Sequence, residues 1–318
     1  MKFETLPPND QYDILCNIAN MYYNQGMTKQ EIAAAYNTTR FKVAKLILQA
    51  REGRIVDIKI NYKSMRNKDM ETSLLQHFPL KRVVVVNTQY SPYLDGLKQL
   101  GQVGAVYLNK SLTPNSVLGL VWGKTMQSVI SQLPQIANNP VTSIQLAGRI
   151  SLTNPSLETD ALMRIVSNAY FGPNFFLDGP LYLKQPHIKE MFCLEPTIQA
   201  TLEKAKEMTV LLTGIGSTTS LPFFKSQFSP YLTEKDKKAA PSCLGSIFGR
   251  ILDKDGQIAD IPLNNKLLAV PLETILAVPR RIAVVCGKHK TKVTARVLRQ
   301  EYINELITDA DTARTLLE

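Results

Sequence analysis

The sequence predicts a two-domain protein, with an N-terminal all-α helix-turn-helix domain and a large doubly wound α/β domain of Rossmann-like type. Two observations predict this fold class. Three short helical patterns with capping residues fill residues 9–53, and from residue 82 onward short β-branched runs alternate with helical stretches. We place the first domain at residues 1–61, a polar connector at 62–80 and the second domain at 81–318.

Residues 9–25 have apolar side chains at helical spacing, and Gly26 ends this first predicted helix. Thr28 is a good N-cap for a second, short helix. Glu31 three residues later completes a capping box, and Asn37 closes the helix. A short helix bounded in this way, with a tight turn after it, is typical of a helix-turn-helix.

The third predicted helix carries the candidate DNA-binding residues. Thr38 or Thr39 caps it, and Gly53 ends it before a strand-like alternation at residues 54–62. One face is apolar, and the other is basic, with four basic residues and no acidic one between Thr38 and Arg51. Such a face is either a solvated surface or a DNA-binding one, and the cap and turn favour DNA. The predicted DNA-binding residues are Thr39, Arg40, Lys42, Lys45 and Arg51.

The second domain shows six short runs typical of buried parallel strands. They lie at residues 82–88, 116–122, 141–148, 174–183, 208–216 and 281–287. Helical stretches between them include residues 94–110, 124–136 and 157–169. This alternation predicts the doubly wound sheet.

Four loops at predicted strand ends carry glycine with polar or basic residues. Ligands of open α/β sheets lie beyond these ends, and glycine with free N–H groups suits an anion. Each loop alone is typical of a simple turn, but together they predict a pocket for a small anionic molecule. Their candidate residues are Gly123, Lys124 and Thr125; Gly148 and Arg149; Gly214, Gly216 and Ser217; and Lys288, Lys290 and Lys292.

The same loops do not match the nucleotide-binding fingerprints. Leu118 stands where a Walker A loop needs glycine, and Thr219 stands at the third glycine of a dinucleotide motif. No acid–base pair stands out near the loops, so we predict no catalytic residue. Lys124 is expected to hold charge rather than to form a Schiff base.

Composition and spacing set further limits. Hydrophobic residues make up 44% of the chain, yet no apolar run approaches the ~20 residues of a membrane span, and no signal core precedes the first helix. We therefore expect a cytoplasmic protein with no membrane partner. The four cysteines and three histidines show no metal or disulfide spacing, so we expect no metal and no cofactor. The formal net charge of +10 favours a polyanionic partner.

Several stretches match a known pattern. YYNQGMTKQEIA, followed by RFKVAKLILQAREGRIV, strongly resembles the N-terminal domain of the SorC/DeoR-type sugar-binding transcriptional regulators of bacteria. The resemblance continues through WGKTM, GIGS, YLTEKD, LGSIFGRILDKDG and CGKHK to YINELITDADTARTLL, so it covers nearly the whole chain. It implies an effector domain that is similar to phosphosugar isomerases and deaminases but acts as a sensor.

The resemblance also implies partners and positions. Members are typically tetramers, or dimers of dimers, on palindromic operators. Double-stranded DNA, further copies of the chain in a dimer or tetramer, and a phosphorylated sugar are therefore the expected partners. Gly123, Lys124 and Thr125 match the loop that contacts the effector phosphate, and Lys290 matches a lysine near it. Gly214 and Gly216 match the family's glycine-rich floor of the effector site. Its recognition helix is matched at Arg40, Lys42 and Lys45.

Two positions depart from the family pattern. Ser246 stands where the family commonly has an acidic residue facing sugar hydroxyls, and Arg149 replaces the second of two glycines. Losing an acid and gaining a cation predicts an effector more anionic than a sugar monophosphate, such as a bisphosphate or a carboxylate like citrate. Two alternatives stay open: a phosphosugar isomerase or deaminase, and a regulator with a degenerate pocket controlled by a protein partner.

Overall fold

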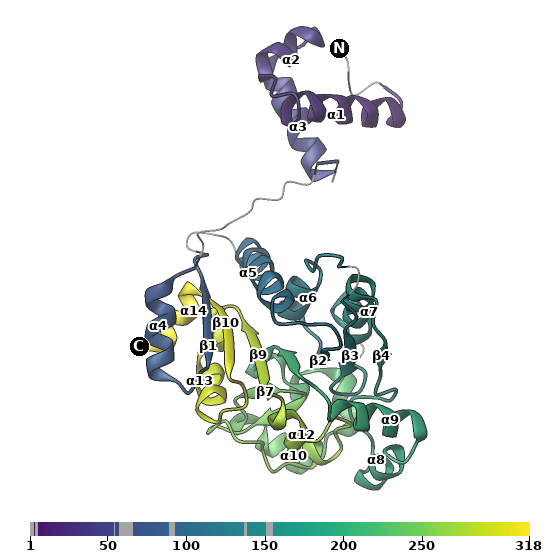
Figure 1. Ribbon diagram of the computed structural model, residues 1–318, viewed down its shortest axis with the longest axis vertical. Coiled ribbons are helices and arrows are strands. Elements are labelled where there is room, and N and C mark those ends of the chain that lie inside the picture. Colours follow the sequence, from purple (N-terminus) through teal and green to yellow (C-terminus); the bar gives the residue numbers. More distant parts are fainter. Residues whose placement is uncertain are drawn as a thin grey trace. The chain divides into compact units, whose positions relative to one another are not determined.

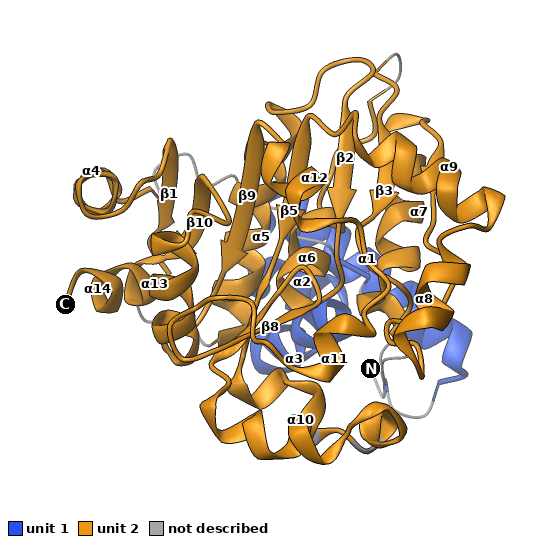
Figure 2. Cartoon of the chain, turned by 90° about the horizontal axis from the view of Figure 1, so that it is seen from below, with its two compact units in different colours: residues 1–64 blue, residues 65–318 orange. Residues whose placement is uncertain are grey.

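The structure, a computed structural model, describes residues 3, 6–53, 55–56, 66–88, 93–136, 139–150 and 155–318. The chain divides into two compact units, residues 1–64 and 65–318 (Figure 2). The predicted fold class is confirmed, because a small helical unit precedes a large unit built on a parallel sheet.

The described part of unit 1 contains three α-helices, α1 (Pro8–Tyr23), α2 (Lys29–Ala35) and α3 (Arg40–Glu52). The predicted capping box is present: the Glu31 carboxylate accepts from the Thr28 N–H at 2.7 Å, and the Glu31 N–H donates to Thr28 Oγ1 at 3.2 Å. Thr39, not Thr38, caps α3 by accepting from the Lys42 N–H. Most of the strand expected at 54–62 lies outside the described residues. The three helices enclose their own small core of Ile18, Ile32, Val43, Leu46 and Ile47.

Unit 2 is built on a seven-stranded sheet in the order β1-β10-β9-β5-β2-β3-β4, and every strand pair is parallel (Figure 1). The four consecutive valines of β1 are all buried. Since successive side chains of a strand point to opposite faces, both faces of the sheet are covered. The strands are β1 (Arg82–Val86), β2 (Val117–Leu120), β3 (Thr142–Gln145), β4 (Asn174–Phe175), β5 (Val210–Thr213), β9 (Arg280–Val285) and β10 (Glu305–Asp309).

The described part of unit 2 also contains a small antiparallel sheet and eleven α-helices. The small sheet consists of β6 (Ile215–Ser217), β7 (Gly245–Ile247) and β8 (Arg250–Leu252). The helices are α4 (Lys68–His77), α5 (Tyr93–Asn109), α6 (Lys124–Ile130), α7 (Thr159–Tyr170), α8 (Pro186–Phe192), α9 (Pro196–Ala205), α10 (Glu234–Ala239), α11 (Pro262–Asn265), α12 (Leu272–Ala277), α13 (Thr291–Arg299) and α14 (Ala310–Leu317).

Several predicted elements differ from the structure. The helix expected at 124–136 ends at Ile130, because Pro134 disfavours helical geometry just before it. The strand expected at 174–183 contains only two strand residues. Strand β10 was not predicted, since polar Glu305 and Asp309 close both ends of its short apolar centre. It nevertheless lies between β1 and β9 in the sheet.

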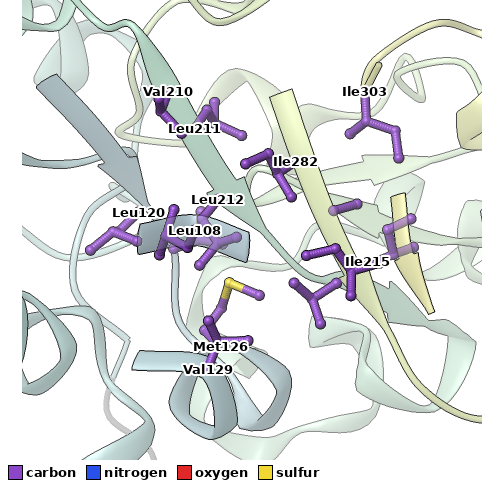
Figure 3. Packing of buried hydrophobic residues seen from close by; sticks show 14 of the residues in the cluster. Leu108, Leu120, Met126, Val129, Val210, Leu211, Leu212, Ile215, Ile282 and Ile303 are labelled. Carbon is purple, nitrogen blue, oxygen red and sulfur yellow. The ribbon is translucent and has the colours of Figure 1, made fainter. Parts of the chain in front are cut away.

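The sheet and α6 share one tightly packed core (Figure 3). Leu120 of β2, Leu212 of β5 and Ile282 of β9 belong to one buried cluster with Met126 and Val129 of α6. All five side chains are fully buried. This packing anchors α6 directly behind the loop that carries the first of the predicted anion-binding residues.

A buried ion pair joins β9 and β10 at the edge where these strands begin. Arg280 donates two hydrogen bonds of 2.8 Å to the carboxylate of Glu305, and the Tyr107 hydroxyl donates a third at 2.6 Å. Burial opposes ionisation of Glu305, but the hydrogen bonds from Arg280 and Tyr107 outweigh it and hold the pKa of this carboxyl below 4.5. The pair therefore stabilises the folded state above pH 4.5, and its contribution is lost as pH falls through the lowered pKa.

We expect Glu305→Gln to lower the free energy of unfolding at pH 7 by roughly 1.5–3 kcal/mol, because a charge-assisted bond to Arg280 is lost. The difference from the wild type should shrink as pH falls below 4.5, where the wild-type carboxyl takes up a proton. Urea unfolding across this pH range measures both effects. Glu203→Gln is the matched control, since Glu203 pairs with Lys206 on the surface and should change stability little. Equal effects of the two variants would contradict the prediction.

Candidate functional site

A cavity of about 340 Å³ lies beyond the carboxyl ends of β2, β5 and β9. Four short segments form most of its wall: residues 121–125 after β2, 214–217 around β6, 246–249 in the β7–β8 hairpin, and 289–290 after β9. This is the edge where open α/β sheets bind ligands. The structure therefore gathers three of the four predicted loops around one space.

The first loop is held open by Gly123. Its φ of +125° is a conformation that a side chain rarely adopts, and its N–H donates to the carbonyl of Leu157 at 2.9 Å. Lys124 is exposed and Thr125 is buried at the start of α6. No hydrogen bond from the Thr125 hydroxyl to another described residue is present. The loop thus offers a charge and a free hydroxyl to the cavity.

The loop after β9 also contains a glycine with a positive φ, Gly287, whose φ is +104°. The Gly287 N–H donates to Asp309 Oδ2 and to Thr312 Oγ1, both at 3.0 Å. Asp309, at the end of β10, also accepts from the Thr312 N–H and hydroxyl. This bonded cluster fixes the turn that brings Lys290 to the cavity.

The cavity is electropositive. Its lining includes Lys124, Lys225, Lys290 and His289, and none of its described lining residues is Asp or Glu. Burial lowers the pKa of Lys290, and the positive charge of Lys124 lowers it further, while Cys286 opposes the shift. Burial and then Lys290 likewise lower the pKa of His289. Neither Lys124 nor Lys290 has a hydrogen bond or ion pair with a described residue. An anion bound between the two lysines would relieve their repulsion.

The floor of the cavity is formed by small residues, several of which carry hydroxyl groups. Gly216 of β6 lies opposite Ser246 of β7, and a Cβ at Gly216 would come within 2.4 Å of Ser246 Oγ. The hydroxyl of Ser217 lies 3.1 Å from that of Thr219. The sequence predicted that four of these small residues contact the effector. All four line the cavity: Gly214, Gly216, Ser217 and Ser246.

Gly148 and Arg149 do not line the cavity. Arg149 pairs with Asp160 at 2.8 Å and with Asp178 at 2.9 Å, so two carboxylates neutralise its charge. Gly148 donates its N–H to the Leu268 carbonyl. The expectation that Arg149 adds a cation to this pocket is therefore not supported by where its side chain lies, and Gly148 has a packing reason to be glycine.

We expect Gly148→Ala to lower the free energy of unfolding by roughly 1–3 kcal/mol, the usual cost of overpacking. A Cβ there would lie 2.6 Å from the carbonyl oxygen of Pro180 and 2.8 Å from that of Gly179, and backbone cannot rotate away. Chemical denaturation measures the loss. Gly123→Ala is a useful contrast, since its Cβ meets nothing within 4 Å and only the positive φ opposes it. Unchanged stability of the Gly148 variant would contradict this packing role.

Sequence reasoning missed several residues of the cavity. Trp122, the only tryptophan, directly precedes Gly123 and could have been included on that ground. Phe248 and Gly249 form a two-residue hairpin turn in which both φ values are positive, a feature visible only in the structure. The other missed lining residues with ionisable or aromatic side chains are Tyr93, Tyr182, Lys225, Phe228 and His289.

The predicted DNA-binding residues lie on α3 and at its cap, apart from the core of unit 1. Arg40, Lys45 and Arg51 are exposed, and Lys42 is half-buried. The opposite side of α3 is buried in the core of unit 1. The structure therefore separates a packed face from a basic face on this helix, as the sequence pattern indicated.

Comparison with known proteins defines the class to which this fold and cavity belong. The family described as "Putative sugar-binding domain" matches residues 62–318, a range that contains every residue lining the cavity. The class is that of transcriptional regulators with a sugar-binding domain. The chain belongs to the SorC/DeoR family of these regulators, which confirms the resemblance seen in its motifs.

Relatives align with the chain over nearly its full length. The sorbitol operon regulator of Klebsiella pneumoniae is 26% identical over 323 residues, covering 98% of this chain and 99% of the relative. The deoxyribonucleoside regulator of Bacillus subtilis (strain 168) is 25% identical over 302 residues, covering 94% and 95%. The crystal structure of the full-length K. pneumoniae regulator SorC matches 96% of this chain and 98% of its own, with a TM-score of 0.73 and 26% identity.

Three further features bear on the site. Among the described residues, no helix is both long and apolar enough to cross a membrane. No cluster of three or more His, Cys, Asp or Glu side chains in the described ranges is arranged to hold a metal ion. All four cysteines are free, and burial raises the pKa of Cys286 beside Asp309 to about 12, which disfavours its thiolate form.

Proposed function

We propose that this regulator binds operator DNA through α3 and responds to a small anionic metabolite bound in the cavity of unit 2. The observation that carries the proposal is the lining of that cavity: Lys124, Lys225, Lys290 and His289 with no acidic side chain among the described residues. A site of this charge binds an anion and disfavours a neutral polyol. We place the anion between Lys124 and Lys290, with the hydroxyl of Thr125 as a further donor.

We further propose that the effector carries more negative charge than a sugar monophosphate. Ser246 in the position of an acid, and Lys225 as a third lysine, support this, whereas Arg149 no longer does. A sugar bisphosphate or a di- or tricarboxylate such as citrate fits this charge. Thermal-shift measurements with glucose 6-phosphate, fructose 1,6-bisphosphate and citrate test it. Stabilisation by the monophosphate alone would rule out the more anionic effector.

The proposal includes no catalytic step. Isomerisation or deamination of a sugar phosphate needs a placed acid or base, and no carboxylate lines the described part of the cavity. Burial, and then the charge of Lys290, lower the pKa of His289 and weaken it as a base. Product formation from fructose 6-phosphate or glucosamine 6-phosphate, followed by nuclear magnetic resonance, would instead support the enzyme alternative.

Native mass spectrometry of the protein purified from its own host tests the proposal most directly. We expect a dimer or tetramer that retains an anionic ligand, and release of that ligand from a Lys124→Met, Lys290→Met double variant. A fully assembled oligomer with no retained ligand, unresponsive to added anions, would favour control by a protein partner. Action on chromosomal DNA also agrees with the cytoplasmic location expected from the sequence.

A further inference from the structure

The basic face of α3 also carries two large apolar side chains that are not buried in the core of unit 1. Phe41 is 77% exposed and Leu48 is 51% exposed. Together with Lys45 they occupy positions i, i+4 and i+7, which lie on one side of a helix. Val43 and Leu46 point the other way, into the core. Phe41 is thus a large aromatic side chain presented to the outside from the first turn of the helix.

Basic residues lie near Phe41 on this face of α3. The guanidinium of Arg40 lies 5.4 Å from the centroid of the Phe41 ring, and Lys45 follows one turn later. An apolar protein partner seated on Phe41 would have to bury these cations, which is costly without matching carboxylates. Duplex DNA offers the complementary arrangement, with phosphates at the edges of the groove and base edges at its floor.

We propose that Phe41 reads thymine in the major groove by packing its ring against the C5-methyl group. The inference rests on the proposed DNA-binding function and adds a residue that determines sequence specificity. The thymine methyl is the apolar group on the major-groove edge of the base pairs, and phenylalanine is suited to contact it. Residues in the first turn of a recognition helix are those that reach base edges. The adjacent Arg40 can then bind the backbone or a neighbouring base.

The test uses the full-length protein and DNA selected from a randomised duplex library. Each thymine of the enriched duplex is replaced in turn by deoxyuridine, which keeps the base pair and removes only the methyl group. We expect one thymine per half-site at which this change weakens wild-type binding about fourfold, the factor for one buried methyl. The Phe41→Ala variant should bind more weakly and show no sensitivity at that thymine.

Tyr12→Ala is the matched control, because Tyr12 is an aromatic side chain of the same unit that is 56% exposed on α1. It should retain the thymine sensitivity of the wild type. Equal sensitivity of the wild type and the Phe41→Ala variant at every thymine would overturn the inference but leave DNA binding intact. Loss of oligomerisation in Phe41→Ala would overturn it in favour of a contact between subunits. Failure of the wild type to enrich any duplex would overturn both the inference and the proposed function.

Discussion

Arg40→Ala and Lys42→Ala are each expected to abolish operator binding by the full-length protein without unfolding it. Both residues lie in the first turn of α3, where recognition helices meet base edges and phosphates. A good contact to a base is worth ~1–3 kcal/mol and is lost in each subunit of an oligomer. The DNA affinity of each variant should therefore be at least about thirtyfold lower than that of the wild type. Fluorescence anisotropy with duplex selected from a randomised library measures the loss, and thermal melting checks the fold.

Lys235→Ala is the matched control for these two variants. It removes the same charge from an exposed residue of unit 2 that does not line the cavity. Its DNA affinity should equal that of the wild type. Wild-type binding should also fall steeply with salt, and each variant should have a shallower salt dependence if its side chain contacts a phosphate. If both Arg40→Ala and Lys42→Ala bind DNA with wild-type affinity, the assignment of α3 as the DNA-binding helix is wrong.

Lys124→Met combined with Lys290→Met is expected to remove the response to the anionic effector while leaving DNA binding unchanged. Each charge-assisted contact contributes about 1.5–3 kcal/mol, so each lysine should account for at least a tenfold loss of effector affinity. Calorimetry with fructose 1,6-bisphosphate and citrate measures it. Lys292→Met is the matched control, because Lys292 is an exposed lysine of the same segment that does not line the cavity.

The lowered pKa of Lys290 makes a second measurement possible. Burial and the nearby Lys124 disfavour its charged form, so Lys290→Met should raise the melting temperature of the ligand-free protein. In the wild type, effector affinity should fall as pH rises through the lowered pKa of Lys290, because the lysine loses the proton that attracts the anion. This fall should begin at a lower pH than for a lysine with the ordinary pKa of 10.5. Undiminished effector affinity in the double variant would contradict the placement of the anion.

Much of unit 1 could be predicted residue by residue. The capping box of Thr28 and Glu31, the cap at Thr39 and the basic face of α3 depend on contacts within about four residues, so local sequence specifies them. Gly123 and Gly287, which begin the loops that carry Lys124 and Lys290, were recognisable for a related reason. A positive φ and a close turn limit those two positions to glycine.

Other features depend on residues far apart in the chain. Strand β10 has polar ends because Glu305 pairs with Arg280 and Asp309 holds the Gly287 loop, and neither partner is visible from local periodicity. Lys225 and His289 reach the cavity only because the segments that carry them fold over the same strand ends. Arg149 looked like a ligand-binding cation until its partners Asp160 and Asp178 were located.

The amino-acid sequence by itself determined the fold class, the helix-turn-helix and three of the four loops that converge on one cavity, because patterning, caps and turns are local properties. Only the tertiary structure decided that Lys225 and His289 also line that cavity and that the charge of Arg149 is neutralised elsewhere. Electrostatic environment is set by burial and by neighbours distant in sequence, so the chemistry of the site depends on packing.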